Sequence, residues 1–135
     1  NLADAAAITI GRLGTFAFSA GWYVYVGSAF GPGGLAGRLN HHLHPALKPH
    51  WHIDYLRQQA TLREIWLLAD PEPFEHAWAA HLCARHDARL PARRFGASDC
   101  RCPAHLFSFD ARPQFSAFSR QIPQGERLVR LRTSR

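Results

Sequence analysis

The chain has 135 residues and a mass of 15.2 kDa, which favours a single compact domain that can bury most of its apolar surface without disulfides. Hydrophobic residues make up 47% and charged residues 19%, a balance that excludes an intrinsically disordered chain. No apolar run is long enough to cross a bilayer, no secretory signal is visible, and three cysteines are too few for a disulfide framework, so we expect a location in the reducing cytoplasm.

The start of the chain has the pattern of β-structure. Residues 5–18 alternate loosely between apolar and polar, which predicts one or two strands, and residues 22–26 predict another. With the turn signal at residues 19–21 between them, these strands are expected to form a β-hairpin. The period of two in a strand places the side chains of Tyr23 and Tyr25 on one face.

A glycine-rich loop at residues 27–34 leads into a predicted helix at residues 35–43. The expected buried stripe of this helix consists of Leu35, Leu39 and Leu43. Arg38 and His42 are four residues apart, so they are expected to be neighbours on one face of the helix.

The second half of the chain predicts two further helices and two strands. They are expected at residues 50–59 (a short helix), 62–69 (a strand), 70–86 (a helix that starts at an Asp-Pro-Glu-Pro signal) and 105–109 (a strand). The side chains that the longer helix should bury are Phe74, Trp78 and Leu82. This order predicts an α+β fold: a small mixed, mainly antiparallel sheet of three to four strands, flanked by helices.

Positive charge is concentrated at the end of the chain. The formal net charge is +6, and residues 112–135 hold six arginines against a single acidic residue, Glu126. We therefore predict a folded domain in residues 1–111 and a basic, Arg-rich tail in residues 112–135. Such a tail suits a polyanion such as nucleic acid. A solvated, partly disordered tail explains the same charge equally well.

Two groups of residues could bind a transition metal. Five histidines lie between residues 41 and 52, but their spacing matches no closed zinc pattern. Cys100, Cys102 and His105 are soft ligands at tight spacing, which indicates a possible Zn²⁺ site. A structural zinc site needs four ligands, and the candidates for the fourth are Cys83, His86 and Asp99. Buried thiols with a hydrogen-bonded His105 are the alternative interpretation.

Three separated blocks of residues carry a recognisable pattern. They are Gly21–Ala29 (GWYVYVGSA), His50–Leu56 (HWHIDYL) and Phe95–Phe107 (FGASDCRCPAHLF). In order and composition these blocks resemble the GIY-YIG nuclease superfamily, most closely its branch of small Uri-type endonucleases, a largely uncharacterised family. The resemblance extends over about residues 8–109 and implies a GIY-YIG-like fold for the domain in residues 1–111.

The resemblance also implies a chemistry, namely phosphodiester hydrolysis with one divalent ion, Mg²⁺ or Mn²⁺. By position it assigns catalytic roles to Tyr25, Arg38 and His42, and metal binding to Glu75. The family motif has a further tyrosine on its first strand, which has no counterpart in this chain, and Tyr23 is a candidate to replace it. Gly27, Ser28, Lys48, His50, His52 and Asp54 are expected to bind the substrate. A carboxylate with waters suits Mg²⁺, and an arginine can neutralise charge on a phosphate. A glutamate in the first turn of a helix is also explained by the helix dipole alone.

The chain departs from the family pattern at its start. The first half of the motif, Gly-x-Tyr, has no counterpart, and the sequence contains no methionine. We therefore expect the first strand to lie upstream of Asn1 and the activity of the chain as written to be impaired. The sequence predicts a metal-dependent endonuclease that acts on DNA and needs no membrane. The alternatives are a non-catalytic nucleic-acid-binding module on a nuclease frame and a small interaction domain stapled by zinc.

Overall fold

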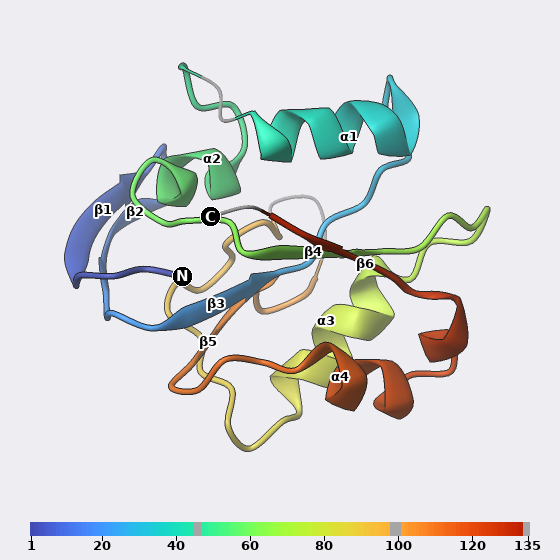
Figure 1. Cartoon of the computed structure of the whole chain (residues 1–135). Helices are drawn as coiled ribbons and strands as arrows, with labels where there is room; N and C mark the ends of the chain where they lie inside the picture. Colours follow the sequence, from blue (N-terminus) through green and yellow to red (C-terminus); the bar gives the residue numbers. More distant parts are fainter. Residues whose placement is uncertain (45–46, 98–100, 134–135) are drawn as a thin grey trace.

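The computed structural model describes residues 1–44, 47–97 and 101–133, and it has the expected α+β fold (Figure 1). In chain order the elements are β1 (Ala6–Ile10), β2 (Gly14–Phe18), β3 (Trp22–Tyr25), α1 (Gly34–Leu43), α2 (His52–Arg57), β4 (Glu64–Leu67), α3 (Glu75–Cys83), β5 (Leu106–Phe109), α4 (Phe115–Gln121), the 3-10 helix η1 (Gly125–Arg127) and β6 (Val129–Arg132). Within the described residues the strands pair as three two-stranded antiparallel sheets, β1–β2, β3–β5 and β4–β6, in place of the expected sheet of three to four strands.

The predicted β-hairpin is wrong in its pairing. The alternating residues 5–18 form both strands of one hairpin, β1–β2, in which Ile8 lies opposite Phe16. Gly11 makes this turn possible, because its φ of +48° lies in the left-handed region. The strand that follows, β3, pairs with β5, more than 80 residues later in the chain. The physical reason is burial: every residue of β5 is buried, so this strand needs a partner inside the molecule, whereas β2 is already paired.

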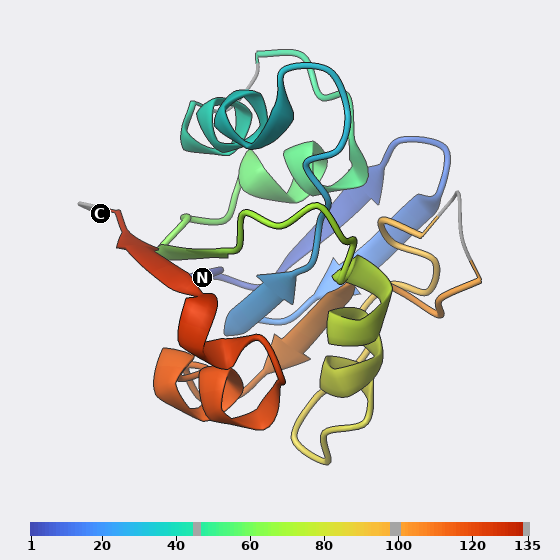
Figure 2. The ribbon, with the colours of Figure 1, turned by 90° about the vertical axis from the view of Figure 1, so that its right-hand side faces the viewer.

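The β3–β5 ribbon separates two hydrophobic cores. Leu106 belongs to one core, together with residues of β1, β2 and α2, and Tyr23 and Tyr25 pack against it. Phe107 belongs to the other core, which includes residues of α3 and α4. Successive side chains of a strand point to opposite faces, so the ribbon contributes to both cores. The prediction that Tyr23 and Tyr25 share a face is therefore confirmed. Figure 2 shows the same arrangement, with α1 and α2 on one side of the ribbon and α3 and α4 on the other.

The predicted helices are all present, with changes at their ends and faces. No residue of α1 is buried, so the expected stripe of three buried leucines is wrong: Leu35 and Leu39 are half-buried, and Leu43 is 43% exposed. The helix α3 begins at Glu75 and not at residue 70, because a proline disfavours helical geometry in the residue before it, and Pro71 and Pro73 precede the helix. Among the described residues, no helix combines the length and the apolar composition needed to span a membrane.

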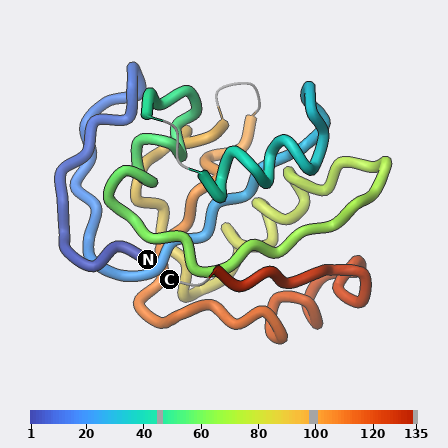
Figure 3. The backbone as a smooth tube through the Cα atoms, turned by 45° about the horizontal axis from the view of Figure 1, so that its top comes forward, coloured from blue at the N-terminus to red at the C-terminus, as the bar shows by residue number. Residues whose placement is uncertain are grey.

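Residues 115–132, expected as part of a basic tail, are folded. They form α4, η1 and β6, and they bury Phe118, Ile122 and Leu128 in the core beside α3. Strand β6 lies antiparallel to β4 (Figure 3). The free energy gained by burying these three apolar side chains outweighs the repulsion between the positive charges of the segment. The prediction of a tail considered the charge alone and is therefore wrong for residues 115–132.

Replacing Phe118 with alanine tests whether this segment belongs to the core. The Phe118 side chain is 4% exposed, so the substitution should lower the free energy of unfolding by about 3–5 kcal/mol, measured by urea denaturation. Val129→Ala is the control, because Val129 is 51% exposed in the same segment and should lose less than about 1 kcal/mol. Equal, small effects of both substitutions would show that residues 112–135 are a solvated tail.

Candidate functional site

One cavity of about 520 Å³ is lined by the residues predicted to act in catalysis, Tyr23, Tyr25, Arg38 and His42, and by the predicted metal ligand Glu75. Tyr25 reaches it from the end of β3, Arg38 and His42 from α1, and Glu75 from the first turn of α3. Gly27 and Ser28, expected to bind substrate, also line it. Tyr25 and Glu75 are 50 positions apart in the sequence, so only the fold makes them neighbours.

Tyr25 is enclosed on several sides. Its ring meets the ring of Phe95 edge-on, with 6.3 Å between the centroids, and the ring of His42 at 6.2 Å. Two glycines leave room for it, because a Cβ atom at Gly96 would lie 3.0 Å from the ring and one at Gly27 would lie 3.1 Å from it. Burial raises the pKa of Tyr25, and the adjacent Arg38 opposes the rise. The hydroxyl is therefore protonated near neutral pH and can donate a hydrogen bond.

Arg38 is held flat at the cavity wall. Its guanidinium carbon lies 3.8 Å from the centroid of the Trp51 ring, and its charge opposes the rise in the pKa of Tyr25. The Nε atom of Arg38 is buried and has no hydrogen-bond partner among the described residues. A buried donor without a partner costs about 1–3 kcal/mol. An anion bound in the cavity would provide the missing acceptor.

His42 is a neutral base beside these two residues. Burial, followed by the nearby charges of Arg38 and His41, lowers the pKa of His42 to about 4. Its backbone carbonyl accepts a hydrogen bond of 3.1 Å from Arg57, which fixes the last turn of α1. A neutral imidazole in this position can accept a proton at physiological pH.

Glu75 has a carboxylate with one engaged oxygen. Oε1 of Glu75 lies 3.1 Å from Nδ1 of His105, and the Glu75 side chain is 20% exposed. Within the part of the chain that the structure describes, Oε2 accepts no hydrogen bond. Mg²⁺ usually binds through one or two carboxylates and keeps several waters, so this donor set fits such an ion.

Tyr23 shares the face of Tyr25, but its hydroxyl is engaged elsewhere. It donates a hydrogen bond of 2.7 Å to the carbonyl oxygen of Ser19, and its ring packs edge-on against Phe18. Burial raises the pKa of Tyr23. The structure thus places this hydroxyl at the turn between β2 and β3, whereas the Tyr25 side chain lies near the positive charge of Arg38.

Four of the expected substrate-binding residues lie outside the cavity lining: Lys48, His50, His52 and Asp54. Asp54 is buried, lies 2.7 Å from Nε2 of His41, and accepts hydrogen bonds from the N–H groups of His50 and Trp51. Burial raises its pKa, but the bonds from Trp51, His41 and His50 hold the pKa of Asp54 below its ordinary value. Asp54 therefore connects α1 to the segment that contains Trp51, the residue whose ring packs against the guanidinium of Arg38.

His52 also lies outside the cavity and contacts a residue that packs against the cavity lining. Its Nδ1 accepts a hydrogen bond of 2.8 Å from the N–H of Gly96, the glycine that makes room for Tyr25. Lys48 and His50 are exposed. Sequence reasoning missed Trp51 as the partner of Arg38 and Gly96 as a close approach to Tyr25. The available signal was their place within the second and third family-like blocks.

Two of the expected zinc ligands lie next to a histidine that was not among the expected ligands. Cys100 and Asp99 lie outside the described residues. Cys102 and His105 lie close to His76, a residue that the sequence analysis does not name, whereas Cys83 and His86 are not part of this group.

Comparison with known proteins gives a family of unknown function. A family model described as "Domain of unknown function DUF123" matches residues 1–127. No curated protein and no solved structure gives a significant match. The matched residues run from before β1 to the end of η1 and so include the whole lining of the cavity, with Tyr25, Arg38, His42 and Glu75.

The low pKa of His42 can be measured by following its ring protons by NMR. We expect a midpoint near pH 4, and a higher midpoint in Arg38→Met, because one of the charges that lowers the pKa is then absent. The folded-state pKa is below the ordinary value of 6.5, so the unfolded chain binds more protons between these values. The contribution of His42 to stability is therefore complete above pH 6.5 and is lost as the pH falls toward 4. A midpoint near 6.5 would contradict this description of the site.

Proposed function

This chain belongs to the DUF123 family, a domain of unknown function, and from that premise we propose that it is a GIY-YIG-type endonuclease that hydrolyses phosphodiester bonds in DNA. One observation carries the proposal: Tyr25, Arg38, His42 and Glu75, far apart in the sequence, line one cavity. They are the residue types that this hydrolysis requires, namely a cation for the phosphate, a base for the water, a hydroxyl and a carboxylate for a metal ion. The proposal places the protein in the cytoplasm, with nucleic acid as its partner.

Arg38 is the phosphate-binding residue of the proposal. Its guanidinium is fixed against Trp51, so little side-chain entropy remains to be lost when an anion binds. The unpartnered Nε donor would bind a non-bridging oxygen of the scissile phosphate. Charge that develops on this oxygen during hydrolysis would then be stabilised by a donor that is already in place.

His42 and Tyr25 act on the attacking water. The imidazole of His42 is neutral at physiological pH, so a ring nitrogen can take the proton that the water loses. The protonated hydroxyl of Tyr25, held between Arg38 and His42, orients the water by a hydrogen bond. The ring of Phe95 packs edge-on against Tyr25, and the ring of His41 packs edge-on against His42, so each of the two residues has limited freedom to move.

Glu75 is the proposed ligand for Mg²⁺ or Mn²⁺. The Glu75 side chain is 20% exposed, and among the described residues its Oε2 atom has no hydrogen-bond partner, as such a ligand requires. When bound, the ion would neutralise charge on the phosphate and lower the pKa of a coordinated water. His105, at 3.1 Å from Oε1, would keep the carboxylate in one orientation.

A second candidate is nucleic-acid binding without catalysis. The contact between Glu75 and His105 favours this candidate. Glu75 is the carboxylate proposed to bind the metal ion, and the contact occupies one of its two oxygens. In that case Arg38 would still hold a phosphate, and the affinity for DNA would fall as salt increases.

Cleavage of labelled single-stranded, duplex and branched DNA in the presence of Mg²⁺ or Mn²⁺ separates the two candidates. Glu75→Gln and Arg38→Met should each reduce the rate by about 100-fold or more, because each removes stabilisation of charge on the phosphate. The matched controls Glu126→Gln and Arg12→Met should leave the rate unchanged, since both residues are exposed and lie outside the cavity. DNA binding by a folded wild-type protein that cleaves none of these substrates would establish the non-catalytic function instead.

A further inference from the structure

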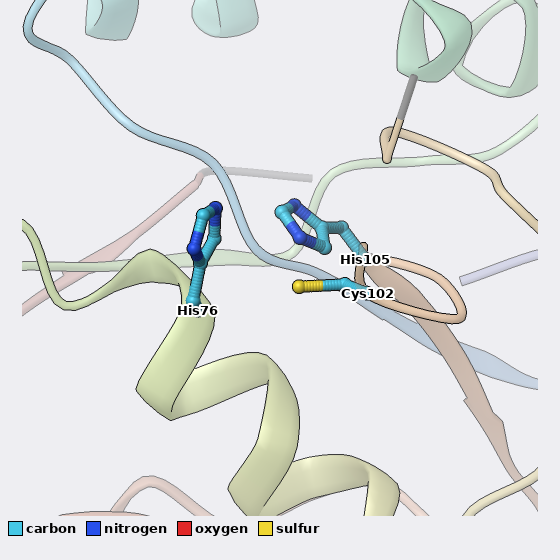
Figure 4. A group of neighbouring side chains, drawn as sticks. All are labelled: His76, Cys102 and His105. Carbon is cyan, nitrogen blue, oxygen red and sulfur yellow. The ribbon is translucent and has the colours of Figure 1, made fainter. Parts of the chain in front are cut away.

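A group of three metal-ligating side chains lies next to the proposed nuclease site. His76 projects from the first turn of α3, while Cys102 and His105 belong to the segment that leads into β5 (Figure 4). One ligand atom from each residue lies within 4.8 Å of the other two. His76 lies 26 positions before Cys102 in the sequence. The fold therefore creates the group, and the local sequence does not.

The chemistry of this group differs from that of Glu75. A thiolate and imidazoles are preferred by Zn²⁺ and related transition metals, whereas Mg²⁺ prefers oxygen. Zinc bonds of about 2.0 Å to nitrogen and about 2.3 Å to sulfur place tetrahedral ligand atoms about 3.3–3.6 Å apart. Movements of about 1 Å close the group to this size, and exposed His76 has the rotational freedom to make them.

Two of the three ligands are already held in position by the backbone. The N–H of His105 donates to the carbonyl of Phe95 at 2.7 Å, and the carbonyl of His105 accepts from the N–H of Val26 at 2.9 Å. The carbonyl of Cys102 accepts a hydrogen bond of 2.7 Å from Arg94. Little ordering of these two residues is therefore needed when an ion binds.

Glu75 completes a pattern that is typical of metal-bound histidine. Its Oε1 atom lies 3.1 Å from Nδ1 of His105, and the His105 side chain is 1% exposed. A carboxylate at one ring nitrogen fixes the tautomer and orients the other nitrogen as the ligand. In this arrangement Glu75 contacts a zinc ligand through Oε1, and the same residue lines the cavity.

We propose that His76, Cys102 and His105 form a zinc site. The ion fastens the start of α3 to the segment before β5, and thereby holds Glu75 at the edge of the cavity. This inference rests on the three ligands alone and stands or falls independently of the nuclease proposal.

The test is metal analysis of the tag-free full chain after dialysis against zinc and then against metal-free buffer. We expect one zinc per chain in the wild type and a loss of at least about 10-fold in zinc affinity in His76→Gln and in Cys102→Ser. The matched controls are His86→Gln and Cys83→Ser, which replace the same residue types outside the group and should retain zinc. Zinc should also raise the melting temperature of the wild type and not that of His76→Gln.

Cobalt substitution identifies the ligand sulfur and excludes binding at the histidines of residues 41–52. The Co²⁺ form of the wild type should show a thiolate-to-metal charge-transfer band, which Cys102→Ser removes and Cys83→Ser retains. Glu75→Gln should keep this band with a zinc affinity about 10- to 100-fold lower, because Glu75 contacts the ligand His105 and not the ion itself. Absence of zinc from the dialysed wild type, or equal zinc content in wild type, His76→Gln and Cys102→Ser, would overturn the proposal.

Discussion

The pairing of β3 with β5 is the constraint on which the rest of the structure depends. The two strands are separated by 80 residues, and their side chains are divided between two cores. All four residues of β5 are buried and all four of β3 are half-buried, so both faces of the ribbon are covered at β5. Each neighbouring element must therefore cover one of its faces, and the cavity is the space that remains beside the end of β3.

The cavity is shaped by two layers of residues. Those that line it, Tyr25 and Arg38 among them, are positioned by others that do not reach it. Asp54 is the clearest example, because one carboxylate binds His41 of α1 and the backbone of Trp51, on which Arg38 lies. A buried carboxylate with all these partners is stable as an anion, and it makes the position of Arg38 depend on the position of α2.

Three of the six arginines in residues 112–135 form ion pairs within the fold. Glu64 of β4 binds both Arg112 and Arg130, and Arg130 lowers the pKa of Glu64 to about 2. Arg127 pairs with Asp70, before α3. Three arginines of the apparent tail thus fasten residues 112–132 to the middle of the chain. A net charge of +6 says nothing about such pairing, so phosphate recognition is better sought at Arg38 than at this segment.

The sequence by itself determined the local structure and the candidate chemistry. Alternation predicted β1, β2 and β3 and placed Tyr23 and Tyr25 on one face, and helical spacing made Arg38 and His42 neighbours, since both patterns depend on residues close in the chain. Tertiary structure decided the partners. It paired β3 with β5 and folded residues 115–132 over Phe118. It also left His50 and Asp54 outside the cavity lining, and it brought His76 close to Cys102 and His105. These outcomes depend on which distant surfaces bury each other, and no local pattern of residues encodes that choice.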